Sequence, residues 1–381
     1  MDDLRHPSWL NINGIINRVT AAHTLSCRPS AGLSIYPQLL GNELDESRIS
    51  RMISTIDATN GFRSELMPMA LASSSSASLA LRNAIMAVSA FHRYGATAAL
   101  QFKAKAVFDE TEENWYFHLD GAKAMLYHLW NVSGGNLRYQ FLYTWLVYHE
   151  VLGAASQPLQ LIQKGTPSID LLADDSFDET VVIGSLGCSL EVLKAIHGLN
   201  QIRCKIMSGP PDITEALILE GRLTSLTQNV SPVEGFESQT CTIEEHRKVI
   251  ETAELYRLSA LLYHQRIHAD YLDRRREREA YLTQAFHIFN RLSICTSPWP
   301  LFVIACEADS DEQRLVIIRM LDHMDEARSI GNIFILREII QSFWKQKDLA
   351  ADCDARSSQP SWLNSLDSLL VDSKGAVPWF I

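Results

Sequence analysis

The sequence predicts an all-α protein, with one large single helical domain built from antiparallel helix pairs. Apolar residues recur at helical spacing along most of its 381 residues. No stretch of comparable length alternates with period two, so we expect no sizeable sheet. A hydrophobic content of 46% is sufficient to bury a full core. We therefore expect a poorly ordered N-terminal arm over 1–40, the helical domain over 41–355 and a C-terminal tail over 356–381.

The arm is predicted because glycine and proline interrupt it and no apolar period is sustained. After the arm, an Ala- and Leu-rich helix is expected over 79–94. The hydroxyls of four serines at 73–76 can accept hydrogen bonds from the free N–H groups of its first turn. Gly95 ends this helix because glycine tolerates positive φ. Good helix formers follow over 97–109.

The segment 115–152 predicts an antiparallel helical hairpin. Two apolar stripes at helical spacing are joined by a short turn at Gly134 and Gly135. The first stripe contains Trp115, Leu119, Ala122, Leu126 and Leu129, and the second contains Phe141, Trp145, Tyr148 and Leu152.

The middle of the chain alternates polar connections with helices. The polar stretch 156–179 contains proline and glycine, so we interpret it as a long loop. Helical spacing returns over 186–207, stops at Gly209-Pro210-Pro211 and resumes through Leu226. A second polar linker is expected over 228–240.

The last third predicts four further helical segments. A long helix over 242–272 has Leu255, Leu258 and Leu262 on one face. Three more are expected at 277–292, at 300–324 with a break near Asp309, and at 331–349. In the last of these, the apolar stripe consists of Ile333, Leu336, Ile340 and Phe343.

The charge of the chain opposes contact with nucleic acid. The net charge is -11 and the pI is about 5.6, so the protein as a whole repels phosphate backbones. A DNA contact would therefore need a local basic patch. The one strong basic run is Asp273-Arg-Arg-Arg-Glu-Arg278, which is open to two interpretations, a nuclear localisation or phosphate-binding segment and the solvated end of a helix.

The sequence also indicates an intracellular protein. The N-terminus begins with acidic residues, and the longest apolar run, 300–306, is far shorter than the roughly 20 residues that a membrane span needs. Seven cysteines are scattered without a C-x-x-C pair, which is typical of reduced, mostly buried thiols.

An aspartate motif offers the main alternative function. Asp174, Asp175 and Asp178 have the D-D-x-x-D form, which is similar to the magnesium-binding motif of class I terpenoid synthases. Such an enzyme would bind magnesium and a prenyl diphosphate. It also needs a second metal motif, and none follows residue 200. A solvated acidic loop before a helix N-terminus is the competing interpretation.

The remaining candidate motifs do not assemble a site. His264 and His268 share a helix face, but Gln265 stands where the zincin motif has its glutamate, and no third ligand is evident. Hydrogen-bonded or exposed helix histidines are the competing interpretation. The sequence contains neither a nucleophile elbow nor a phosphate-binding glycine loop. We therefore predict no enzyme, and no catalytic, cofactor-binding or metal-binding residue.

Several segments, taken in order, resemble the fungal-specific transcription factor domain. This is the large helical region that lies C-terminal to many zinc binuclear cluster DNA-binding domains. The motif H-L-D-G-A at 118–122 lies in its middle hairpin, and the resemblance covers about residues 60–350. The segments that resemble the family are 79–92, 115–122, 141–153, 184–194, 299–308 with 313–314, and 343–345 with 347–348.

One departure from the family is informative. A zinc binuclear cluster needs six cysteines within about thirty residues, since two zinc ions share bridging thiolates. The N-terminal arm contains only Cys27. Two explanations stay open, a regulator without its own DNA-binding module and a gene model that lacks an upstream exon. Members without the cluster are similar to regulators of fungal secondary-metabolite pathways, trichothecene-pathway regulators among them.

The resemblance implies a nuclear transcriptional regulator that acts through protein partners. Grooves between its helices would receive a helix of a DNA-bound transcription factor or a coactivator. Direct DNA binding is not expected from this chain alone, and a homodimer stays open. A third hypothesis is a sensor whose interhelical cavity binds a metabolite and biases partner contact.

Overall fold

The computed structural model describes most of the second half of the chain and parts of the first half. All of the described residues belong to one compact unit. They are residues 60–71, 78, 81, 119, 121–124, 126–127, 131, 140–156, 169, 178–206, 213–230, 243–267, 273–328, 331–352 and 363.

Helix α11 (Ile243–Ile267) is the central element of the described fold. It packs against α9 (Leu190–Ile206), α10 (Ile213–Ser225), α12 (Arg275–Phe289) and α13 (Pro298–Glu307). The expected stripe of Leu255, Leu258 and Leu262 is fully buried. Because α11 has neighbours on several sides, apolar burial extends well beyond one stripe of its surface.

Helix α13 is apolar except for Glu307 at its end, and all ten of its residues are buried. Pro298 occupies its first turn, where the missing N–H costs no intrahelical hydrogen bond. Trp299 stacks on Tyr256 at a ring-centroid distance of 6.0 Å and meets the edge of Tyr263 at 6.4 Å. Helix α13 and the facing side of α11 thus form the aromatic centre of the core.

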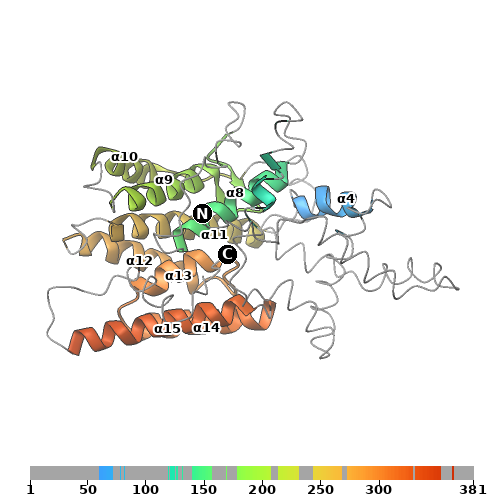
Figure 1. The fold of residues 1–381 in the computed structure, drawn as a ribbon. Coiled ribbons are helices and arrows are strands. Elements are labelled where there is room, and N and C mark those ends of the chain that lie inside the picture. The colour runs from blue at the N-terminus through green and yellow to red at the C-terminus, as the bar shows by residue number, and fades with distance from the viewer. Residues whose placement is uncertain are drawn as a thin grey trace, which may run out of the picture. The chain divides into compact units, whose positions relative to one another are not determined.

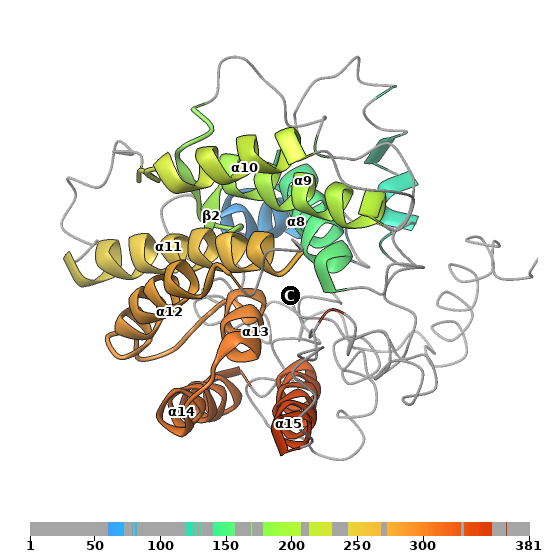
Figure 2. The ribbon, with the colours of Figure 1, turned by 90° about the vertical axis from the view of Figure 1, so that its left-hand side faces the viewer.

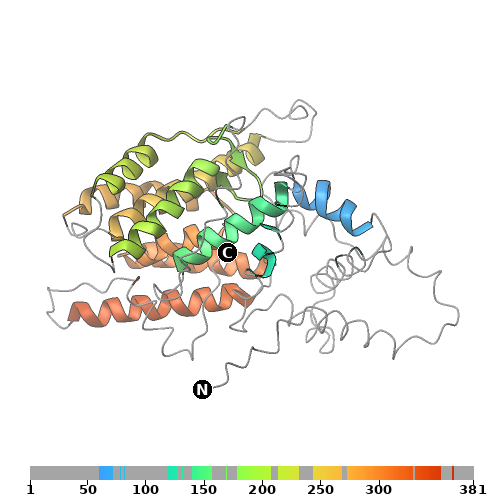
Figure 3. The same cartoon turned by 45° about the horizontal axis from the view of Figure 1, so that its top comes forward.

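Helices α8 (Gln140–Ser156) and α9 lie side by side (Figure 3). Buried polar groups fix this pair to α11. The Asn200 amide donates to the carbonyl of Val151 at 2.8 Å and accepts from the Tyr263 hydroxyl at 3.0 Å. The Arg203 guanidinium donates to the carbonyl of Ala155 at 3.3 Å. These bonds give hydrogen-bond partners to polar side chains that would be costly to bury alone.

The helices are arranged in successive layers, visible in Figures 1 and 2. Helices α9 and α10 pack on one side of α11, and α12 and α13 pack on the other. Helices α14 (Asp311–Arg328) and α15 (Gly331–Asp352) lie beyond α12 and α13. The pairs Arg314–Asp348 and Arg337–Asp322, both 2.7 Å long, show that α14 and α15 run antiparallel.

The predicted break near Asp309 is confirmed, since α13 ends at Glu307 and α14 begins at Asp311. A capping box starts α14. The Ser310 hydroxyl accepts from the backbone N–H of Gln313 at 3.2 Å, and the Gln313 side chain accepts from the N–H of Asp309 at 2.9 Å and of Ser310 at 3.4 Å. These bonds satisfy N–H groups that have no partner within the helix.

A short helical segment at residues 62–71 precedes α8. A π-helical turn η1 (Phe62–Leu66) continues into α4 (Met67–Leu71), and the N–H of Met67 donates to the carbonyl of Phe62. Pro68 has no N–H to donate to a preceding turn. The Glu65 carboxylate accepts from the backbone N–H of Phe141 at 3.3 Å and thereby caps the start of α8.

The predicted start of the helix at residue 186 is wrong, because α9 begins at Leu190. The residues before it form a small antiparallel pair, β1 (Val182–Ile183) and β2 (Cys188–Ser189). Gly187 has a φ of 71°, a left-handed value that glycine adopts without strain. No residue within a right-handed α-helix has such a φ, so the helix cannot start before Gly187. β-branched residues at 181–183 also favour a strand.

The linker predicted over 228–240 is anchored at its first residues. The Gln228 side chain accepts from the N–H of Ser189 at 2.8 Å and donates to the carbonyl of Ala253 at 2.6 Å. Asn229 pairs with Val181 in a parallel bridge. Gln228 therefore joins β2 to α11, and residues 231–240 lie outside the described residues.

The all-α prediction is confirmed, since the described chain is mainly helical with one two-stranded sheet. The second helix of the predicted hairpin is α8, and Tyr143 on it donates to the carbonyl of Leu126 at 3.0 Å, which places parts of both predicted helices in contact. The turn at 134–135, the arm over 1–40 and nearly all of the tail over 356–381 lie outside the described residues. None of the helices in the described part of the chain is long and apolar enough to cross a membrane.

Candidate functional site

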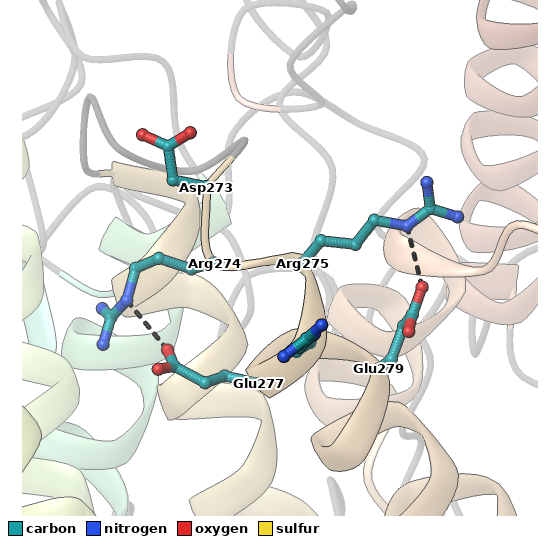
Figure 4. Close-up of a pocket in the computed structure, with 6 residues that line it drawn as sticks. Asp273, Arg274, Arg275, Glu277 and Glu279 are labelled. Atoms are coloured by element: carbon teal, nitrogen blue, oxygen red, sulfur yellow. Dashed lines mark hydrogen bonds and ion pairs between the residues drawn. The ribbon is translucent and has the colours of Figure 1, made fainter.

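The basic run at 273–278 forms the start of α12, as Figure 4 shows. Arg274 and Arg275 point in opposite directions. The Arg274 Nε atom pairs with Glu277 at 2.9 Å, and its guanidinium also pairs with Glu220 of α10. The Arg275 Nε atom pairs with Glu279 at 2.8 Å, and this bond raises the pKa of Arg275. Each of these two arginines therefore has an acidic partner.

An open hollow of about 620 Å³ lies over this turn. Its lining contains three arginines and three carboxylates, namely Asp273, Arg274, Arg275, Arg276, Glu277 and Glu279. The charges balance, so the hollow does not form the coherent basic patch that a phosphate contact needs. This geometry favours the solvated helix end over the targeting or phosphate-binding interpretation of the run.

Arg278, the last arginine of the run, points inward and is 7% exposed. Its Nε atom lies 4.0 Å from Glu307 at the end of α13. Arg266 of α11 makes a two-pronged contact with the same carboxylate, with donor–acceptor distances of 2.8 and 2.6 Å. This buried cluster of Arg266, Arg278 and Glu307 joins three helices, which gives these side chains a structural role.

Asp178 is the one residue of the aspartate motif that the structure describes. Its carboxylate accepts from the Thr180 backbone N–H at 3.0 Å and from the Thr180 hydroxyl at 2.8 Å. These two bonds lower the pKa of Asp178. The carboxylate is thus engaged in a local turn before β1, on no long helix. Asp174 and Asp175 lie outside the described residues.

His264 is buried in α11, and its Nε2 atom lies 3.0 Å from the carbonyl oxygen of Ala216 in α10. The interpretation of a hydrogen-bonded helix histidine is confirmed for this residue. Gln265 donates to Glu277 at 3.3 Å, and His268 lies outside the described residues. Among the residues that the structure describes, no group of three His, Cys, Asp or Glu side chains is placed to hold a metal ion.

The buried hydroxyls and thiols of the core are held in their neutral forms. The Tyr148 and Tyr256 hydroxyls lie 2.7 Å apart, and burial raises the pKa of Tyr256 well above its usual range. Burial also raises the pKa of the Cys188 thiol, and burial together with the neighbouring Glu307 raises that of Cys306. A thiol with a raised pKa is a poor nucleophile at neutral pH, so these cysteines pack as apolar side chains.

A family model described as the fungal specific transcription factor domain matches residues 46–108 and 99–369. Together these segments cover most of the chain. The chain belongs to the fungal-specific transcription factor domain family. The match includes every element from η1 to α15, so the helices described above are the scaffold of this family.

One relative is similar to this chain over a shorter segment. Transcription factor iacI of Pestalotiopsis fici is 33% identical over 96 residues. That alignment covers 25% of this chain, and the chain spans about a quarter of the relative's length. No solved structure matches the chain.

The cluster of Arg266, Arg278 and Glu307 was not predicted from the sequence. Arg278 was placed in the basic run, no prediction was made for Arg266, and Glu307 directly follows an apolar run. The available signal was the single acidic residue at the end of an otherwise apolar helix, since a buried carboxylate requires a basic partner. Its partners come from two other helices, so spacing along the chain could not identify them.

Proposed function

We propose that this fungal-specific transcription factor domain protein regulates transcription in the nucleus through protein partners. The observation that supports the proposal is the family match over most of the chain. The relative named as a transcription factor is consistent with it. The described side chains of Asp178, His264 and Cys188 serve a local turn and the core. Such roles fit a regulator better than an enzyme.

The regulator reaches its genes through a partner that holds the DNA. A net charge of -11 opposes non-specific DNA affinity, which depends on basic side chains that neutralise phosphates. The strongest basic run does not compensate, because Arg274, Arg275 and Arg278 each lie beside a carboxylate. The partner in this proposal is a DNA-bound transcription factor or a coactivator.

The outer side of the α14–α15 pair is the surface that we assign to this partner. Leu315, Phe334 and Leu349 are 55%, 64% and 57% exposed. The Arg314–Asp348 pair brings the neighbouring Leu315 and Leu349 to one end of the helix pair. Phe334 lies fifteen residues before Leu349, about 22 Å along α15. Apolar anchors over this span fit an amphipathic partner helix of several turns.

The regulated genes are those of a secondary-metabolite pathway in this proposal. The experiment compares transcripts under inducing conditions in a strain with the gene deleted and in strains with surface variants. Deletion is expected to change a defined gene set, and an unchanged transcriptome would overturn the regulatory function.

The double variant Leu315→Asp, Leu349→Asp tests the partner surface separately. Both leucines are more than half exposed, so their replacement leaves the core intact. The expected result is the transcript change of the deletion strain with normal protein abundance. Ile243→Asp, at a position that is 91% exposed on α11, is the matched control and should behave as the wild type. If the double variant also behaves as the wild type, the assigned surface is wrong while the regulatory function stands.

A further inference from the structure

Helix α10 has an outer side that no described helix covers. It packs inward on α9 and α11 through Ala216, Leu219 and Leu223, which are buried. Figure 2 shows α10 at the edge of the layered helices, with its opposite side turned away from them. The residues on that side are therefore available to a partner.

An apolar and uncharged ridge runs along this outer side. Leu217 and Ile218 are 59% and 57% exposed, a high fraction for large aliphatic side chains. Gly221 lies one turn later, and a Cβ atom added there would meet no other atom within 4 Å. Thr214 and Ser225, both exposed, lie at the two ends of the ridge. The ridge is thus a protruding pair of aliphatic side chains beside a notch.

The charges beside the ridge are already paired within the chain. On the α9 side, Glu215 pairs with Lys205 at 2.6 Å and Arg222 pairs with Glu191 at 2.6 Å. On the other side, Glu220 pairs with Arg274. A partner that covers the ridge therefore needs a surface that is itself uncharged, because a charged group buried there would find no opposite charge.

We propose that the ridge binds the same ridge of a second copy of this chain, with the two α10 helices antiparallel. The pattern of side chains is self-complementary about a two-fold axis midway between positions 218 and 221. Ile218 then fills the notch at the partner's Gly221, and Thr214 meets the partner's Ser225. An isologous contact forms each of these pairs twice. The antiparallel arrangement also places the positive N-terminal end of each helix dipole beside the negative C-terminal end of the other, which is favourable.

The size of the ridge sets the strength of this dimer. Helix α10 has 13 residues and is about 20 Å long. Each copy contributes one such helix with two large exposed aliphatic side chains, a small contact beside specific interfaces, which bury about 1,200–2,000 Å² in total. The dimer is therefore reversible and dissociates on dilution.

Sedimentation velocity on the full chain, over roughly a hundredfold concentration range, tests the proposal. The wild type should move from a species of 42.9 kDa towards twice that mass as concentration rises. Ile218→Asp and Gly221→Gln should stay monomeric, because the first puts a charge on the ridge and the second fills the notch. Both positions are exposed, and circular dichroism verifies that the variants stay folded.

Ile243→Asp is the matched control, since it removes an exposed apolar side chain from a different helix. It should dimerise as the wild type does. A wild type that stays monomeric at all concentrations overturns the proposal. So does a dimer that Ile218→Asp and Gly221→Gln leave intact, or one that only Ile243→Asp abolishes. The proposal does not depend on the transcriptional function, because it is measured on the purified chain.

Discussion

At the residue scale, replacement of Glu307 tests whether its buried ion pairs stabilise the fold. It is 1% exposed and pairs with Arg266, while Arg278 lies at 4.0 Å. Glu307→Ala would leave two buried guanidinium groups without this carboxylate, and removal of one partner of a buried pair costs about 3–5 kcal/mol. Urea unfolding followed by circular dichroism should show a loss of this size. Glu215→Ala, which breaks the exposed pair with Lys205, is the control and should cost at most about 1 kcal/mol. Equal effects of the two variants would contradict a buried pair.

Two glycines should respond to alanine in opposite directions. Gly187 has a φ of 71°, and a Cβ atom there would lie 3.1 Å from the Tyr256 ring. Gly187→Ala should therefore lower the free energy of unfolding by about 1–2 kcal/mol. Gly221 lies within α10, where an added Cβ atom meets nothing, so Gly221→Ala should raise it by up to about 1 kcal/mol. Thermal unfolding measures both changes, and a stabilised Gly187→Ala variant would be inconsistent with the left-handed turn.

His149 should make stability depend on pH. Burial lowers its pKa to about 4, although its hydrogen bond with the Trp145 carbonyl acts in the opposite direction. The pKa in the unfolded chain is about 6.5, so the unfolded state binds the proton first as pH falls. The free energy of unfolding should then decrease between pH 6.5 and 4, by up to about 1.4 kcal/mol per pH unit.

His149→Phe provides the comparison, because it keeps an aromatic ring beside Trp145 and Tyr148. The two proteins differ only at this position, so the difference between their pH profiles isolates His149. Parallel profiles between pH 6.5 and 4 would show that His149 titrates alike in the folded and unfolded chains.

At the element scale, Ser310 controls the start of α14. Its hydroxyl accepts from the Gln313 N–H, and α13 ends only three residues before Ser310. Ser310→Ala removes the cap and should cost about 1 kcal/mol of stability. Ser310→Asp should retain most of it, since a carboxylate can accept the same bond and is favoured at a helix N-terminus. Equilibrium urea unfolding of the two variants measures the difference, and equal losses would exclude the cap.

The elements that the sequence predicted well are those whose apolar stripe is continuous. The stripe of Ile333, Leu336, Ile340 and Phe343 is buried throughout in α15. The start of α9 was missed because Leu186 lies four residues before Leu190, a spacing that also suits a helix. Residues 188–189 instead pair with β1, and the Ser189 N–H donates to the side chain of Gln228, which is distant in the sequence. Local spacing does not contain that information.

At the scale of the whole molecule, the fold class followed from periodicity, whereas the roles of polar side chains did not. His264 was correctly interpreted as a hydrogen-bonded histidine, but its acceptor in α10 lies 48 residues away. The arginine run illustrates the same limit. Its sequence shows four arginines, and only the folded chain shows that Glu220, Glu279 and Glu307 lie beside three of them. Charge counted along the chain therefore overestimates the charge that solvent meets.

That limit leads to a prediction for the intact chain and DNA. The net charge is -11, and the basic side chains at the start of α12 are matched by carboxylates. Non-specific affinity for DNA comes from phosphate neutralisation by free basic side chains, so this chain should give no shift of a random-sequence duplex at about 150 mM salt. Electrophoretic mobility shift with micromolar protein measures this. The variant Glu277→Lys, Glu279→Lys removes the carboxylate partner of Arg275 and one of the two partners of Arg274, and it adds two basic side chains beside them. It should show weak binding that disappears as salt rises. Wild-type binding with a steep salt dependence would instead require a basic surface elsewhere on the protein, and a DNA-bound partner would no longer be needed to explain how the chain reaches its genes.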